Sequence, residues 1–224
     1  MVVKKRGKKK DKEHWWQGHK NFKVVIFGSS RIKNDDSSYK RVKNLAKMIG
    51  ERGIDVITGG GPGLMKAASY GHHLGRKKSK VKTHTFGLSI RLPNEQETNK
   101  FVDIEKNFVR FSNRIDNFML LANAIVIAPG GVGTLLELFY SWQLVQVKQA
   151  CDIPIILMGD QWPDLIKWLK KYPMKKKLIG KDDMNFLFFV KTPEEAMEII
   201  DKTCDKYNKG EKDFCLNYKK YKFN

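Results

Sequence analysis

One segment, residues 124–137, constrains the fold more than any other part of the chain. It opens with an apolar run, AIVIA, which Pro129 and two glycines end, and this pattern predicts a short buried strand. After the turn, an apolar pattern of helical period runs from Thr134 to about Gln149. A strand, a glycine-rich turn and a helix N-terminus in this order are typical of phosphate sites. The first helical turn has free N–H groups and carries the positive end of the helix dipole.

Glu137 lies one turn inside that predicted helix. A phosphate held by the turn would repel this carboxylate, so we expect Glu137 to act on another part of a bound ligand. The alternative is an ordinary strand-to-helix turn with structural glycines, and a G-G-x-G string alone leaves that alternative open. The full string, PGGVGTLLE, is longer than turn geometry requires, which favours a functional role.

The rest of the chain alternates short apolar strands with helical patterns. Strands are predicted at residues 23–27, 55–58, 83–90, 101–104, 124–128, 153–158 and 186–190. Helices are predicted to end near residues 52, 75, 121, 149 and 171, and a last helix to start after Thr192. This alternation predicts an α/β, Rossmann-like fold, with an open and mostly parallel sheet and helices on both faces.

Two further turns follow predicted strands, and we expect them at the same edge of the sheet, where such folds bind ligands. They are GSSR at residues 28–31 and GGGPGLM at residues 59–65. Their candidate ligand contacts are Ser29, Gly60 and Gly61, and plain turns are the alternative. Neither turn is a G-x-G-x-x-G fingerprint or a P-loop with its lysine, so NAD and ATP are not the expected ligands.

Three more side chains are candidates for contact with an anionic ligand. Arg110 and Arg114 are one turn apart where the predicted helix at residues 111–121 begins, so they face either a substrate or solvent. Glu95, in the polar segment at residues 91–96, either bonds a sugar or base or faces solvent.

Charge divides the 224 residues into a body and two basic ends. The formal net charge is +19, and seven Lys or Arg side chains lie between residues 4 and 12. We expect a basic arm without fixed structure at residues 1–21, one domain at residues 22–207 and a basic tail at residues 208–224. This charge suits anionic ligands and permits weak non-specific binding of nucleic acid, although a solvated tail is the simpler explanation.

Three cysteines, Cys151, Cys204 and Cys215, lack the close spacing of metal ligands. We therefore expect ordinary thiols in a reducing compartment, no metal and a cytoplasmic location. No apolar run approaches the length of a membrane span, and the basic start lacks the apolar segment of a secretory signal.

The string PGGVGTLLE resembles the P-G-G-x-G-T-x-x-E motif of the LOG (Lonely Guy) family. Other segments resemble that family in the same order, namely GSS at 28–30, GGGPGLM at 59–65, LPNEQ at 92–96, PIILMG at 154–159 and TPEEA at 192–196. The similarity spans residues 22–202.

The resemblance implies hydrolysis of the N-glycosidic bond of nucleoside 5'-monophosphates, which releases the free base and ribose 5-phosphate. Members of the family were long labelled as lysine decarboxylases. The implied substrates are AMP and cytokinin riboside monophosphates, and no cofactor is implied. The resemblance also implies a homodimer or a larger assembly, with each site near a subunit interface.

The same resemblance implies that Arg114 and Glu137 form the catalytic pair. Breaking a ribosyl C–N bond builds positive charge on the sugar, which a carboxylate stabilises while it orients water. The arginine would position the substrate or assist the leaving base. Glu95 matches a nucleotide-contacting position, and the implied phosphate contacts are Gly130, Gly131, Val132, Gly133 and Thr134.

The chain departs from the family pattern at three positions. Ile115 stands where a lysine is common, and Tyr140 and Gln143 align with an acidic residue and a threonine. These changes leave the preferred base and the rate open. The alternative function is a non-catalytic nucleotide- or RNA-associated binding protein on the same fold. A decarboxylase has less support, since nothing in the chain resembles a pyridoxal phosphate lysine site.

Overall fold

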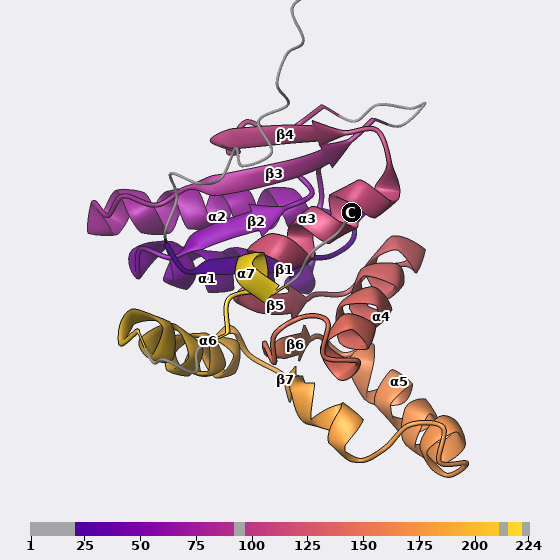
Figure 1. The fold of residues 1–224 in the computed structure, drawn as a ribbon. Coiled ribbons are helices and arrows are strands. Elements are labelled where there is room, and N and C mark those ends of the chain that lie inside the picture. Colours follow the sequence, from indigo (N-terminus) through magenta and orange to yellow (C-terminus); the bar gives the residue numbers. More distant parts are fainter. Residues whose placement is uncertain (1–20, 92–96, 211–214, 221–224) are drawn as a thin grey trace, which may run out of the picture.

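The computed structural model describes residues 21–91, 97–210 and 215–220, and these residues form a layered α/β fold. A parallel sheet of seven strands runs through it in the order β4-β3-β2-β1-β5-β6-β7 (Figure 1). The strands are β1 Lys23–Phe27, β2 Asp55–Thr58, β3 Thr85–Ile90, β4 Ile104–Phe108, β5 Ala124–Ile127, β6 Ile155–Met158 and β7 Leu187–Val190. The helices are α1 Ser37–Glu51, α2 Leu64–Ser79, α3 Phe111–Leu121, α4 Val132–Gln146, α5 Trp162–Leu169, α6 Pro193–Asn208 and α7 Asn217–Lys220. A π-helical segment, Lys170–Met174, follows α5, and a 3-10 helix, Asp182–Phe186, precedes β7.

The central strands are buried on both faces, which explains their nearly unbroken apolar sequences. Successive side chains of a strand point to opposite faces. Val25 and Ile125 therefore join the core beneath α3, α4 and α5, whereas Val24 and Val126 join the core beneath α1, α2 and α6. This arrangement confirms the predicted Rossmann-like fold.

The order of the strands places one ligand-binding position at the centre of the sheet. β1 pairs with β2 on one side and with β5 on the other, so the chain reverses its direction of progress beside β1. Open α/β sheets bind ligands at such a switch point, outside the carboxyl ends of the strands. The turns after β1, β2 and β5 all lie at that edge, as the sequence predicts.

Strand β4 lies later in the chain than the sequence pattern indicates. We expect a strand at residues 101–104, whereas β4 spans Ile104–Phe108 and pairs with β3 from Phe86↔Ile104 onward. β4 is an edge strand that alternates partly buried with exposed side chains, and Glu105 and Lys106 dilute its apolar signal. The segment at residues 101–104 is more apolar, and the strand is therefore predicted there.

The C-terminal residues 215–220 correct the expectation of three ordinary thiols. Cys215 forms a disulfide bond with Cys151, so two of the three cysteines are not free thiols. Asn217, which is buried, accepts a bond from the Cys151 N–H at 2.7 Å and donates to the carbonyl oxygens of Met119 and Ala122 at 2.8 and 3.1 Å. This part of the basic tail is thus attached to the domain, and the sequence did not indicate it because a pairing across 64 residues leaves no local pattern. Cys204 is free, and burial raises the pKa of its thiol.

Candidate active site

Three turns meet at the carboxyl edge of the sheet and hold one another in place. The Ser29 N–H donates to the Pro129 carbonyl oxygen at 3.0 Å, and the Leu64 N–H donates to the Ser29 carbonyl oxygen at 2.9 Å. The turn after β1 is thus bonded to the turns after β5 and β2. Gly63 has φ +63°, and a Cβ atom there would lie 2.4 Å from the Ser29 carbonyl oxygen. Only glycine permits this approach.

Arg114 of α3 and Glu137 of α4 face each other beside these turns. Arg114 Nη1 lies 3.8 Å from Glu137 Oε1, and the two side chains are only 14% and 15% exposed. Among the described residues, Arg114 is the one charged partner that the structure gives this carboxylate. The structure thus brings together the two residues that the sequence places in one catalytic pair.

Arg114 is held in position by three groups, of which one lies on α3 itself and two come from other parts of the fold. Its Nε donates to the Leu88 carbonyl oxygen of β3 at 2.7 Å, and its guanidinium lies 5.1 Å from the centre of the Phe118 ring. Its Nη2 rests against Gly59, where a Cβ atom would lie 2.3 Å away. Sequence reasoning named Gly60 and Gly61 as site residues and missed Gly59. The run of three glycines was visible, but which one faces Arg114 depends on the tertiary packing.

The buried position of Glu137 brings its titration close to neutral pH. Burial raises the pKa of this carboxyl group to about 7, although the neighbouring Arg114 lowers it. Burial also lowers the pKa of Arg114, which the charge of Glu137 opposes. A carboxyl group with such a pKa, in the second turn of α4, can exchange a proton during a reaction at neutral pH.

The turn after β5 presents open backbone at the N-terminus of α4. Among the described residues, no atom lies within 4 Å of a Cβ position added at Gly131 or Gly133, and Val132 is 85% exposed. No side chain in that part of the protein caps this helix. The N–H groups of its first turn therefore remain available for an anion.

Two of the five predicted phosphate contacts have protein partners instead. Thr134 is 4% exposed and packs beneath Gly130, where an added Cβ atom would lie 2.1 Å from its Oγ1. The Gly130 N–H donates to Gln161 Oε1 at 3.1 Å, and Gln161 Nε2 donates back to the Gly130 carbonyl oxygen at 3.3 Å. Sequence reasoning missed Gln161, because no motif connects the residue before α5 to this turn.

The other predicted contacts divide between the site edge and its supports. Ser29 Oγ accepts a bond from the Arg31 N–H at 3.1 Å. Gly60 has φ +77°, and the carbonyl oxygens of Gly60 and Gly61 accept bonds from Asn99 Nδ2 at 2.9 and 3.0 Å. Asn99 is a second residue that the sequence gave no reason to select.

The two remaining candidates are Arg110 and Glu95. Arg110 is exposed where α3 begins, whereas the side chain of Arg114 is only 14% exposed. Glu95 lies outside the described residues.

The residues that depart from the family pattern take structural positions near the pair. The Tyr140 hydroxyl donates to the Asp116 carboxylate and so joins α4 to α3, the two helices that carry Glu137 and Arg114. Ile115 is partly buried, and Gln143 is exposed and bonds Gln146. Within residues 21–91, 97–210 and 215–220, no group of His, Cys, Asp and Glu is arranged to hold a metal ion. No helix in the same ranges is long and apolar enough to cross a membrane.

Comparison with known proteins gives the same picture. The profile of a family described as "possible lysine decarboxylase" matches residues 65–200. A pyrimidine/purine nucleotide 5'-monophosphate nucleosidase of Escherichia coli K12 is 30% identical over 147 residues, which are 61% of this chain and 30% of that protein. The chain therefore spans about 30% of the length of this curated relative.

Solved structures share the fold at low sequence identity. The Moco carrier protein of Chlamydomonas reinhardtii aligns with a TM-score of 0.60 and 21% identity, over 83% of this chain and 99% of that one. The molybdenum cofactor binding protein of Rippkaea orientalis gives a TM-score of 0.57 and 21% identity, over 81% and 96%. The match of the family profile across more than half of the chain, together with the PGGVGTLLE string at the site, shows that the chain belongs to the possible lysine decarboxylase family, which is the LOG family.

Proposed function

We propose that this protein hydrolyses the N-glycosidic bond of nucleoside 5'-monophosphates, releasing the free base and ribose 5-phosphate. The observation that carries the proposal is the buried Glu137 carboxyl group, with a pKa of about 7, beside Arg114 and one turn behind an open helix N-terminus. The Escherichia coli relative is a nucleosidase of nucleotide 5'-monophosphates, which supports this choice of reaction.

The phosphate and the sugar would occupy neighbouring parts of the site. The N–H groups of Gly131, Val132 and Gly133 would hold the 5'-phosphate. Glu137 lies four residues beyond Gly133, about 6 Å along the helix axis. That offset suits the span from the phosphate of a ribose 5-phosphate to its anomeric carbon, and it keeps the carboxylate away from the phosphate charge.

In the reaction, the C1'–N bond breaks and its electron pair leaves with the base. Positive charge develops on the sugar, and the Glu137 carboxylate stabilises that charge. A water molecule forms the new C1'–O bond and gives its proton to Glu137, which must therefore be ionised at the start. The departing base takes up a proton, and loss of the proton from Glu137 restores the carboxylate, so the reaction consumes one water molecule and releases the neutral base. Arg114, fixed by Leu88 and Gly59, would orient the substrate or stabilise the leaving base.

The preferred substrates, the assembly and the location of the protein complete the proposal. AMP and cytokinin riboside monophosphates are the substrates that we propose, with each site near the interface of a homodimer or larger assembly. A cytoplasmic location and weak non-specific binding of nucleic acid through the basic ends remain predictions.

Chromatography of the free base tests the reaction. Purified protein would be incubated with AMP, other monophosphates, isopentenyladenosine monophosphate and unphosphorylated adenosine. We expect base only from monophosphates, about a 1,000-fold loss of turnover in Glu137→Gln, and retained AMP binding in that variant. Glu198→Gln, which changes an exposed carboxylate of α6, is the matched control. AMP binding without release of base by the wild-type protein would refute the reaction and favour the non-catalytic binding protein.

A further inference from the structure

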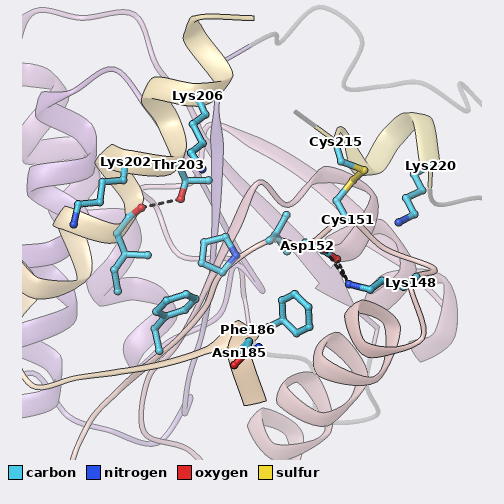
Figure 2. Close-up of a pocket in the computed structure, with 14 residues that line it drawn as sticks. Lys148, Cys151, Asp152, Asn185, Phe186, Lys202, Thr203, Lys206, Cys215 and Lys220 are labelled. Carbon is cyan, nitrogen blue, oxygen red and sulfur yellow. Dashed lines mark hydrogen bonds and ion pairs between the residues drawn. A yellow bond between two sulfur atoms is a disulfide. The ribbon is translucent and has the colours of Figure 1, made fainter. Parts of the chain in front are cut away.

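A second cavity lies at the opposite edge of the sheet from Glu137. Its volume is about 860 Å³, within the range of small-molecule sites. Pro154 and Phe186 line it, and they directly precede β6 and β7, so the cavity opens at the amino ends of these strands. Figure 2 shows α6 on one side of it and the Cys151–Cys215 disulfide on the other.

The floor of this cavity is apolar and partly aromatic. Phe186, Phe188, Pro154, Ile153 and Ile199 form the apolar part of its lining. Phe188 is 39% exposed. A planar ring bound against the phenylalanines would cover this exposed apolar area.

The rim of the cavity is strongly basic. Lys148 pairs with Asp152 at 2.9 Å and lies 4.7 Å from the centre of the Phe186 ring. Lys202, Lys206 and Lys220 also line the cavity, and the described part of the chain offers no carboxylate within ion-pair distance of any of the three.

Lys202 and Lys206 are one turn apart on α6, and both are among the residues that line the cavity (Figure 2). Like charges at this spacing repel each other, and an acidic group bound between them would remove that repulsion. The apolar and aromatic part of the lining suits an aromatic ring. Lys202, Lys206 and Lys220 suit an acidic group.

We propose that this cavity binds a small molecule with a planar aromatic ring and an acidic group. The ring would lie against Phe186 and Phe188, and the acidic group would bond Lys202 and Lys206. The site is distinct from the one that holds Arg114 and Glu137, because the two lie at opposite ends of the parallel strands. The proposal does not rest on the nucleosidase activity.

Titration with 1-anilinonaphthalene-8-sulfonate, an aromatic anion whose fluorescence rises on binding, tests the proposal with the full chain. We expect saturable binding that saturating ribose 5-phosphate, which has an acidic group but no aromatic ring, does not displace. Lys202→Glu combined with Lys206→Glu should weaken binding by at least about tenfold, since it replaces two charge-assisted contacts with repulsion. Phe188→Ala should weaken it several-fold.

The matched control makes the same change of charge elsewhere. Lys175 and Lys176 are exposed after the π-helical segment, outside the cavity, and their double change to glutamate should leave the affinity for the dye unchanged. If the charge reversal on α6 lowers the melting temperature, Lys202→Gln with Lys206→Gln replaces it, and we expect the same direction of effect.

Competition assays separate the chemical classes of ligand. Naphthyl phosphate should displace the dye, neutral naphthalene-methanol should not, and hexyl phosphate should displace it more weakly. Unchanged dye affinity in the lysine variants, displacement of the dye by ribose 5-phosphate, or equal competition by hexyl phosphate would each overturn the proposal.

Discussion

Two glycine-rich turns of this protein have similar sequences and opposite surroundings. Both follow a buried strand and precede a helix, one at residues 59–63 and the other at residues 130–133. In the first, an added Cβ atom would lie 2.3 Å from Arg114 Nη2 at Gly59 and 2.4 Å from a backbone oxygen at Gly63. In the second, Gly130 is packed against Thr134, whereas Gly131 and Gly133 face open space within the described part of the chain.

The difference shows that glycine serves two purposes at the same edge of one sheet. The first turn uses glycine to let protein groups approach each other, and it thereby sets the position of Arg114. The second turn uses glycine to leave backbone N–H groups open beside Glu137. A glycine-rich sequence alone cannot separate these cases, because it shows where a side chain is missing but not what occupies the space.

The largest effect that we expect is a loss of stability in Gly63→Ala. Its φ of +63° is unfavourable for alanine, and the methyl group would collide with the backbone of Ser29 and Ser30. The strain and the overpacking together should cost about 3 kcal/mol or more of the free energy of unfolding. Denaturant unfolding measures this loss, and a change below about 1 kcal/mol would contradict a packed first turn.

Gly59→Ala should instead damage activity while sparing the fold. The atoms that the methyl group meets, Arg114 Nη2 and Met65 Sδ, are the far ends of flexible side chains that can move aside. Displacing Arg114 by about 1 Å should lower kcat/KM about 100-fold. Steady-state kinetics and a melting curve on the same preparation test this contrast. A large drop in melting temperature with normal kcat/KM would show that Gly59 serves the fold rather than the site.

The sequence predicted those parts of the fold that local pattern determines. The helix predicted at residues 111–121 is α3 itself, because Phe118 and Leu121 recur on one face of a regular helix. The last helix begins directly after Thr192, as predicted, and Thr192 and Glu195 form a capping box there. The sequence did not predict the bounds of β4 or the Cys151–Cys215 bond. An edge position in the sheet and a long-range pairing both depend on the assembled fold and not on local pattern.

The candidate site also contains residues that the sequence selects and residues that only the fold brings to it. The motif and the resemblance to the family select Glu137 and Arg114 as candidates. The groups that support them come from distant segments: Leu88 is 26 residues from Arg114, and Gln161 is 31 residues from Gly130. A hydrogen bond between a side chain and a remote backbone group has no sequence signature, so these supports appear only in the folded chain.

The pH dependence of kcat/KM should show how Arg114, which Gly59 helps to place, affects the pKa of Glu137. With the Glu137 pKa at about 7, kcat/KM should fall about tenfold for each pH unit below 7, because the reaction needs the carboxylate. Arg114 lowers that pKa, so Gly59→Ala should move the acidic limb to higher pH. The control is a profile for Glu198→Gln, which should match the wild type. An acidic limb near the ordinary glutamate pKa in the wild-type enzyme would contradict this account.

The same group affects stability with a sign that can be checked. The folded-state pKa of Glu137 lies above its ordinary value of 4.5, so the native state binds more protons between those two pH values. The contribution of Glu137 to the free energy of unfolding is therefore fully present below about pH 4.5 and is lost as the pH rises through about 7. Denaturant unfolding at several pH values should show this loss in the wild type and not in Glu137→Gln.

The smallest effect on the fold should come from Gly133→Ala in the second turn. This glycine has open space around it and lies in the first turn of α4, where alanine has the better helix propensity. The free energy of unfolding should stay the same or rise by up to about 1 kcal/mol. The methyl group would project toward the proposed phosphate position, so KM for AMP should rise several-fold while kcat stays nearly constant, as for a lost binding contact. A loss of stability would show that the second turn is as packed as the first. An unchanged KM would move the phosphate away from Gly133, and the contrast between the two turns would then concern the protein alone and not its ligand.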